Sequence, residues 1–232
     1  MGIVIKQSAY ASAINYLGVA IGAINTIFLY PAFLTKSELG LLKAIFAMAI
    51  ILAPFAQFGL GRSTLRFFPR FSASNKTKGR FLSLILMLAS ICIAIFLLLF
   101  QVFDDWIFNY FREKAPELAH HYWLILILAF LMVYMAIFEA YYRALLNVVI
   151  PAFFREFFLR ISSTIIVFLY FKNLIDFQLF LYLSVISYAV SILLLVLVLK
   201  AKNLLFFIFS VFQIEKSFLR ELSKYMLFIM AG

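Results

Sequence analysis

The sequence is poor in charge for its length. Only 13% of its 232 residues are Asp, Glu, Lys or Arg, whereas 66% are hydrophobic, including 30 Phe. A soluble protein of this size leaves roughly a quarter to a third of its extended surface in water. The 10 acidic and 20 basic side chains cannot cover that area. A water-soluble globular domain is therefore excluded, and lipid is the expected solvent for much of the chain.

Residue patterns typical of catalysis and metal binding are also missing. The one cysteine, Cys92, lies in an apolar run, which excludes an intrachain disulfide and a cysteine-based metal site. His120 and His121 are adjacent and have no partner at i, i+4, so metal binding is not expected. No GxxxxGK[ST] loop, GxSxG elbow or HExxH motif occurs. The sequence therefore predicts neither an enzyme nor a cofactor.

Long apolar runs take up most of the chain. A helix needs about 20 apolar residues to cross a bilayer core, and the runs predict an all-α bundle of six spans in a lobe at 1–200. The spans lie at about 9–34, 41–60, 81–103, 123–142, 155–171 and 177–199. Positions 201–224 are expected to form a cytoplasmic linker between two lobes, with the apolar stretch Leu204 to Ile214 at the membrane interface or extending the sixth helix. A seventh run at 225–232 is too short to cross, so we expect the sequence to be the front part of a longer protein.

The net charge of +10 could indicate nucleic acid as a partner, but the distribution of the bases points to the membrane. Fifteen of the 20 Lys and Arg residues fall into one alternate set of the segments between spans. Because cytoplasmic loops carry the excess of bases, this asymmetry predicts a cytoplasmic N-terminus. Nucleic acid is not expected as a partner.

The first span carries a stripe of small and polar residues at helical spacing. Small residues such as Gly18 and Gly22 let a neighbouring helix come close, and buried amides need partners that lipid cannot supply. Asn15 and Asn25 are therefore interpreted either as cross-links between helices or as the lining of a polar cavity. The full stripe is Ser8, Ala11, Asn15, Gly18, Gly22 and Asn25.

The second span has a comparable seam with Lys43 near its outer end. Pro54 removes a backbone hydrogen bond and predicts a kink. Lys43 either extends its side chain to the headgroups or faces a cavity, and its seam partner Gln57 favours the cavity. The seam comprises Gly40, Lys43, Ala47, Ile50, Pro54, Gln57 and Gly61.

Two further groups of charges are candidate sites. Glu139 is the one acid within a fully apolar run, and it either pairs with Arg143 at i+4 or couples an ion to transport. Arg62, Arg66 and Arg70 recur every four residues and predict one basic helical face up to a break near Pro69. That face is either topogenic charge or a site for anionic lipid headgroups or a lipid-linked phosphate.

The stretch from Asn15 to Phe71 resembles the opening of a known transporter family. Its features are Asn25-Thr26, then Leu34-Thr35 with Glu38 and Gly40, then Phe58-Gly59-Leu60-Gly61 followed by Leu65 and Arg66. In these residues the chain resembles bacterial polysaccharide biosynthesis proteins. These are the O-antigen type flippases of the superfamily of multidrug, oligosaccharidyl-lipid and polysaccharide exporters. The resemblance covers about the first 70 residues.

The resemblance implies a transporter of two lobes with about 12 to 14 helices. It further implies alternating access in the bacterial inner membrane, with an undecaprenyl-pyrophosphate-linked oligosaccharide as cargo for lipopolysaccharide or other surface polysaccharide. A polysaccharide polymerase and glycosyltransferases would be partners. Lys43, Asn15, Asn25 and Gln57 are the cavity candidates. Two alternatives are a cation-coupled exporter of small molecules and a membrane scaffold subunit that does not transport.

Overall fold

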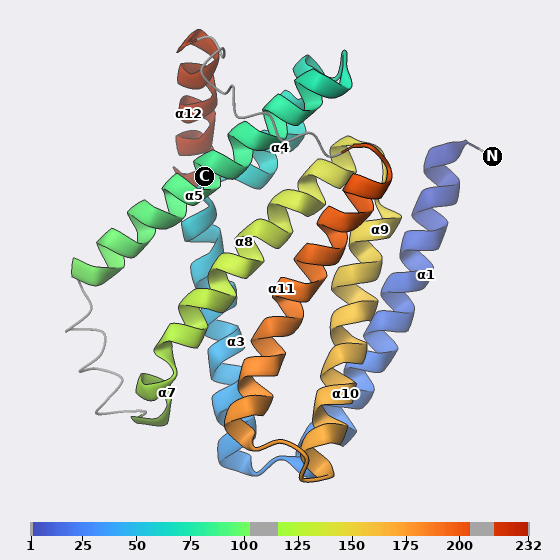
Figure 1. Ribbon diagram of the computed structural model, residues 1–232, viewed down its shortest axis with the longest axis vertical. Helices are drawn as coiled ribbons and strands as arrows, with labels where there is room; N and C mark the ends of the chain where they lie inside the picture. Colours follow the sequence, from blue (N-terminus) through green and yellow to red (C-terminus); the bar gives the residue numbers. More distant parts are fainter. Residues whose placement is uncertain (1, 103–115, 205–215, 232) are drawn as a thin grey trace.

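The computed structural model describes residues 2–102, 116–204 and 216–231, and every regular element in these ranges is a helix. Five helices are long and apolar enough to cross a membrane: Ile5–Phe33, Lys36–Gln57, Asn75–Val102, Tyr122–Ala144 and Phe177–Ala201. The chain is therefore an all-α membrane protein with several spans, as the sequence predicted (Figure 1). Position 103 of the predicted third span and most of the predicted interfacial stretch lie outside the described residues.

All the described elements are helical. In chain order they are α1 (Ile3–Ile24), the π-helix η1 (Asn25–Leu29), α2 (Tyr30–Phe33), α3 (Lys36–Gln57), α4 (Leu60–Phe67), the 3-10 helix η2 (Phe68–Phe71), α5 (Asn75–Val102), α7 (Pro116–His120), α8 (Tyr122–Ala144), α9 (Val149–Ala152), the π-helix η3 (Phe153–Phe158), α10 (Leu159–Phe171), α11 (Phe177–Ala201) and α12 (Lys216–Ala231).

The predicted span at 155–171 is part of a longer helix built from three segments. α9 leads into η3, and η3 leads into α10. α10 alone has 13 residues, which is too short to cross a bilayer core. Only the three segments together, over positions 149–171, reach roughly 30 to 35 Å at about 1.5 Å per residue. This helix therefore depends on its charged lead-in for its length.

The start and end of α3 follow from local sequence chemistry. Thr35 and Glu38 form a capping box, in which the Glu38 carboxylate accepts from the Thr35 amide at 2.8 Å and the Thr35 hydroxyl accepts from the Glu38 amide at 3.3 Å. At the other end Phe58 and Gly59 are left-handed, with φ of 49° and 72°. That turn ends α3 and starts α4 in a new direction.

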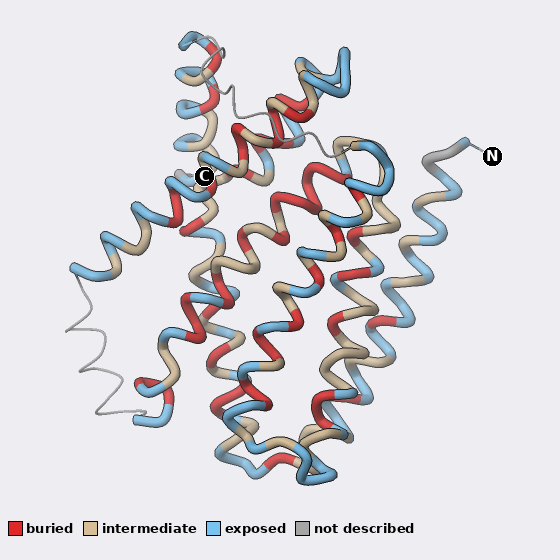
Figure 2. The backbone as a smooth tube through the Cα atoms, viewed as in Figure 1, coloured by how far each residue is buried: buried red, intermediate tan, exposed pale blue. Residues whose placement is uncertain are grey.

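α8 lies at the centre of the bundle. It contacts α3, α4, α5 and α11, and most of its side chains are buried (Figures 1 and 2). α1 lies at the edge, where it contacts η3, α9 and α10 and leaves most of its surface uncovered. α3 and α8 are therefore held firmly, whereas α1 depends on one neighbouring helix.

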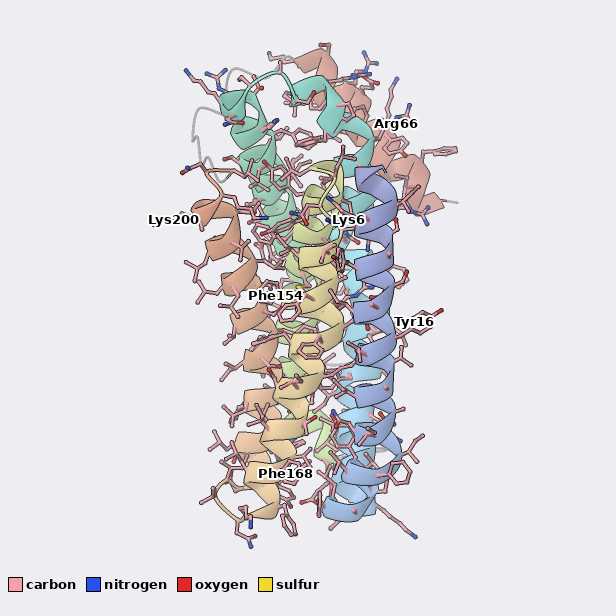
Figure 3. The ribbon with its side chains drawn as sticks, turned by 90° about the vertical axis from the view of Figure 1, so that its right-hand side faces the viewer. Lys6, Tyr16, Arg66, Phe154, Phe168 and Lys200 are labelled. Carbon is pink, nitrogen blue, oxygen red and sulfur yellow. The ribbon has the colours of Figure 1, made fainter. Side chains whose placement is uncertain are left out.

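The described helix ends lie at two ends of the bundle (Figure 1). Lys6, Arg66 and Lys200 mark one end, here called the basic end, and Phe168 lies near the other (Figure 3). α12 packs at the basic end, where Phe218 and Leu222 join the core formed with α4 and α5. α12 begins at Lys216, inside the stretch predicted as a linker. That the basic end faces the cytoplasm stays a prediction.

Candidate functional site

The seam predicted on α3 is turned away from the other described helices. Lys43, Ala47, Ile50 and Pro54 are exposed. The opposite face of α3 is buried, through Leu41, Leu42, Ile45, Ala49 and Ala56. Lys43 therefore projects from a firmly held helix to a side that no other described helix covers.

A pocket of about 410 Å³ lies at the basic end of this seam. It is formed where α3, α4 and α12 meet. The predicted site residues Gln57 and Arg62 both line it. The other lining residues are Pro54, Phe55, Gly59, Ile229 and Met230.

Two glycines shape this pocket. A Cβ atom on Gly59 would lie 3.1 Å from the Cγ2 of Ile229, and the residue already has a positive φ, so the turn needs glycine for both reasons. A Cβ atom on Gly61 would lie 2.5 Å from the Nε2 of Gln57. Gly61 therefore leaves the space that the Gln57 amide occupies.

The three predicted arginines share one exposed surface, but they have different surroundings. Arg66 stacks on Tyr225 of α12, with its guanidinium carbon 4.1 Å from the ring centroid. Arg70 donates two hydrogen bonds to Glu221 of α12, at 2.6 and 2.9 Å. Arg62 lines the pocket instead. The basic face is thus partly used to hold α12, and the break near Pro69 is the 3-10 helix η2.

The two asparagines of the first span lie in different environments. The Asn25 amide donates to the backbone oxygen of Arg160 at 3.0 Å, and its oxygen accepts from the Thr164 hydroxyl at 2.8 Å. Asn25 is buried, whereas Asn15 is exposed. Asn25 is therefore a cross-link between helices, and Asn15 does not share that contact.

Gly18 and Gly22 allow the close helix contact that their spacing predicted. A Cβ atom on Gly18 would lie 2.5 Å from the backbone oxygen of Glu156, and one on Gly22 would collide with the Arg160 guanidinium. The Nη1 of Arg160 donates to the Gly18 backbone oxygen at 2.6 Å. The glycines thus form the groove into which η3 and Arg160 fit.

Glu139 belongs to a network of charges instead of a single pair. Its carboxylate accepts from the predicted partner Arg143 at 3.2 Å and also from Arg155 at 2.9 Å. Arg155 donates to Glu156 at 2.8 Å, and Glu156 accepts from Arg160 at 2.6 Å. Glu139 is buried, so the two arginines offset the cost of its charge.

The network includes a second acid, Glu156, which lies in η3 and within the predicted span at 155–171. Its spacing to Arg160 was a local signal for an ion pair. The contact from Arg155 to Glu139 joins two helices and has no local signal.

The described residues offer no metal centre. Among them, no three His, Cys, Asp or Glu side chains are placed to share an ion. His120 and His121 each direct Nδ1 at a backbone oxygen of α7, at 3.2 and 2.8 Å.

Comparisons with known proteins supply no family for this chain. No family model, curated protein or solved structure matches it.

Proposed function

We propose that the chain is one lobe of a flippase that moves an undecaprenyl-pyrophosphate-linked oligosaccharide across the bacterial inner membrane. The cargo would pass from the inner to the outer leaflet by alternating access, for the synthesis of surface polysaccharide. The observation that carries this proposal is Lys43 on the uncovered face of α3. A base within a span is costly in lipid, and it becomes useful where an anionic cargo passes.

The position of Lys43 along α3 supports a role in a cavity. It lies seven residues after Lys36, the first residue of the helix, which corresponds to roughly 10 Å along the axis. Gln57 lies at the opposite end of the same helix, and Arg62 of α4 lies just beyond it in the same pocket. The face therefore offers hydrogen-bond donors near both ends and an apolar stretch between them.

Residues of the family resemblance set the bounds of α3. Thr35 and Glu38 of its LT-x-x-E feature form the capping box at the start of the helix. Phe58 and Gly59 of its FGLG feature form the left-handed turn at the end. The resemblance is thus carried by residues that fix the helix bearing Lys43.

The two alternatives use other parts of the molecule. An exporter coupled to a cation needs a carboxylate that can bind the ion, but the Glu139 carboxylate is engaged by Arg143 and Arg155. A scaffold subunit needs no base on an uncovered face. The surroundings of Lys43 and Glu139 therefore favour the flippase.

Replacing Lys43 with Gln tests the proposal. In a strain whose own gene is deleted, we expect the K43Q protein to reduce display of surface polysaccharide by about tenfold or more. This corresponds to the loss of one charge-assisted hydrogen bond to the cargo, about 1.5–3 kcal/mol. Display is measured by labelling cell-surface glycan, and protein level by immunoblot.

Lys172→Gln is the matched control, because Lys172 is an exposed base at the same end of the bundle as Lys43 but lies outside α3. We expect it to leave display within about twofold. Normal display with K43Q at a normal protein level would contradict the proposal and favour a scaffold.

A further inference from the structure

We infer that the pocket between α3, α4 and α12 binds a phosphate group, that of an anionic lipid headgroup or of a free phosphate ester, and that its occupancy holds α12 in the docked position. The site is at the opposite end of α3 from Lys43, although Gln57 and Arg62 also belong to the face proposed for the cargo. It lies at the basic end, and its ligand can bind whether or not the protein transports.

Of the three arginines of the basic face, Arg62 is the one whose guanidinium is free to bind a ligand. Arg66 is stacked on Tyr225, and Arg70 is paired with Glu221. Within the described part of the chain, no carboxylate lies at ion-pair distance from Arg62. Its guanidinium can therefore donate two parallel hydrogen bonds to phosphate oxygens.

Gln57 adds a second donor to the same pocket. Its Nε2 atom lies against Gly61, where any side chain larger than hydrogen would push it away. Gln57 and Arg62 both line the cavity, so an amide N–H and a guanidinium meet in one place. Several donors and an unneutralised positive charge are the chemistry that recognises phosphate.

The size and surroundings of the pocket fit the headgroup of a lipid. Its volume of about 410 Å³ falls in the usual range for small-molecule sites, about 300–1,000 Å³. Directly beside it, α3 exposes Ile50, Ile51 and Phe55, each more than half exposed. An acyl chain could lie along these side chains while the phosphate contacts Arg62.

α12 supplies one wall of the pocket, through Ile229 and Met230. The wall is held by Arg66 and Arg70 and by the packing of Phe67 against Phe218 and Tyr225, with ring centroids 5.4 and 5.6 Å apart. A ligand that binds only when this wall is present stabilises the docked position by mass action. Arg62 would bind the ligand, while Arg66 and Arg70 position the wall.

The test uses the purified chain in detergent and three probes: dioctanoyl-phosphatidylglycerol, dioctanoyl-phosphatidylcholine and inorganic phosphate. Calorimetric titration is expected to show binding of phosphatidylglycerol that is about tenfold weaker in R62Q and closer to the unsubstituted protein in R62K. R220Q is the matched control, because Arg220 is an exposed arginine of α12 outside the pocket. It should change affinity less than about twofold.

Docking of α12 is read separately, from the distance between spin labels on A73C and S223C, with Cys92 replaced by Ala. Ala73 and Ser223 are both exposed, so the labels can be attached without disturbing the core. Phosphatidylglycerol is expected to narrow the distance distribution in the protein with Arg62 and to leave it unchanged in R62Q. If inorganic phosphate competes with phosphatidylglycerol for the pocket, the ligand is assigned as a free phosphate. If inorganic phosphate does not compete, the ligand is assigned as a lipid headgroup.

The inference would be overturned in favour of diffuse charge attraction by either of two results. One is that R62Q binds phosphatidylglycerol as tightly as the unsubstituted protein, and the other is that R220Q weakens this binding as much as R62Q does. Equal binding of phosphatidylcholine would also overturn it. A variant that loses lipid binding but keeps normal polysaccharide display separates this site from the proposed transport. A variant that keeps lipid binding but loses display does the same.

Discussion

Gly18 and Gly40 are both helical glycines, but their surroundings are opposite. At Gly18 an added Cβ would meet the backbone oxygen of Glu156, which cannot move as a side-chain tip can. At Gly40 the space within 4 Å is empty. The same substitution should therefore have opposite effects at the two positions.

We expect Gly18→Ala to destabilise the folded chain by about 1–3 kcal/mol, because overpacking separates α1 from η3. Gly40→Ala should instead stabilise it by up to about 1 kcal/mol, since alanine favours the helix more than glycine. Denaturant unfolding in mixed micelles, followed by circular dichroism, measures both. If the G18A protein is as stable to unfolding as the G40A protein, the close contact of α1 with η3 does not contribute to stability.

At the same scale, the predictable contacts are the local ones. The pair of Glu139 with Arg143 followed from spacing along one helix, and so did the close approach at Gly18 and Gly22. Arg155 meets Glu139 from another helix, and that contact depends on how η3 packs against α8. Helical spacing does not specify such a packing angle, so the larger network was missed.

At the scale of elements, the sequence predicted where the long apolar helices lie along the chain. It did not predict which neighbouring helices pack on their faces. The predicted seam follows α3 as far as Gln57, but Gly61 lies on α4 beyond the left-handed turn, and nothing in the spacing told whether another helix covers the seam. The docking of α12 on the basic face was likewise missed. It depends on Tyr225 and Glu221, which lie about 150 residues from their partners, as the separation of 151 between Arg70 and Glu221 shows.

The ion pair of Glu221 with Arg70 makes the docking of α12 sensitive to acid. The hydrogen bond from Arg70 lowers the pKa of Glu221 below its ordinary value of 4.5, with Arg66 adding a smaller effect in the same direction. The contribution of the pair is therefore complete above about pH 4.5 and is lost as the pH falls through the lowered pKa.

We expect the distance distribution between spin labels at positions Ala73 and Ser223 to broaden reversibly as the pH falls below the ordinary carboxyl pKa of 4.5. In Glu221→Gln the distribution should be the same on both sides of that range, because no carboxylate remains to titrate at this position. An equal response in both proteins would assign the acid sensitivity to another group.

At the scale of the whole molecule, the alternation of bases predicts the sidedness of the bundle. Arg66 and Lys200 lie at the basic end, and Phe168, four residues before Lys172, lies near the other (Figure 3). The structure shows which of the described helix ends lie together, and the positive-inside rule then predicts that the basic end faces the cytoplasm.

Fusions to alkaline phosphatase, which is active only outside the cytoplasm, test this assignment. A fusion after Arg80 is expected to be inactive and one after Lys172 active. β-Galactosidase fused at the same positions should give the reciprocal result. Swapped signals would reverse the orientation and place the pocket between α3, α4 and α12 on the outer side.

The two π-helical segments, η1 and η3, lie in neighbouring helices that contact each other's α-helical parts. A π turn is equivalent to one residue inserted into an α-helix. Deleting one residue from η3 would restore ordinary helical winding and leave the two flanking parts nearly in phase, because the wider π turn holds the extra residue locally. Arg155 and Glu156 lie within η3, so the deletion would redirect these two side chains, whereas Arg160 lies beyond the segment. The π turn therefore sets where the central charges of the network point.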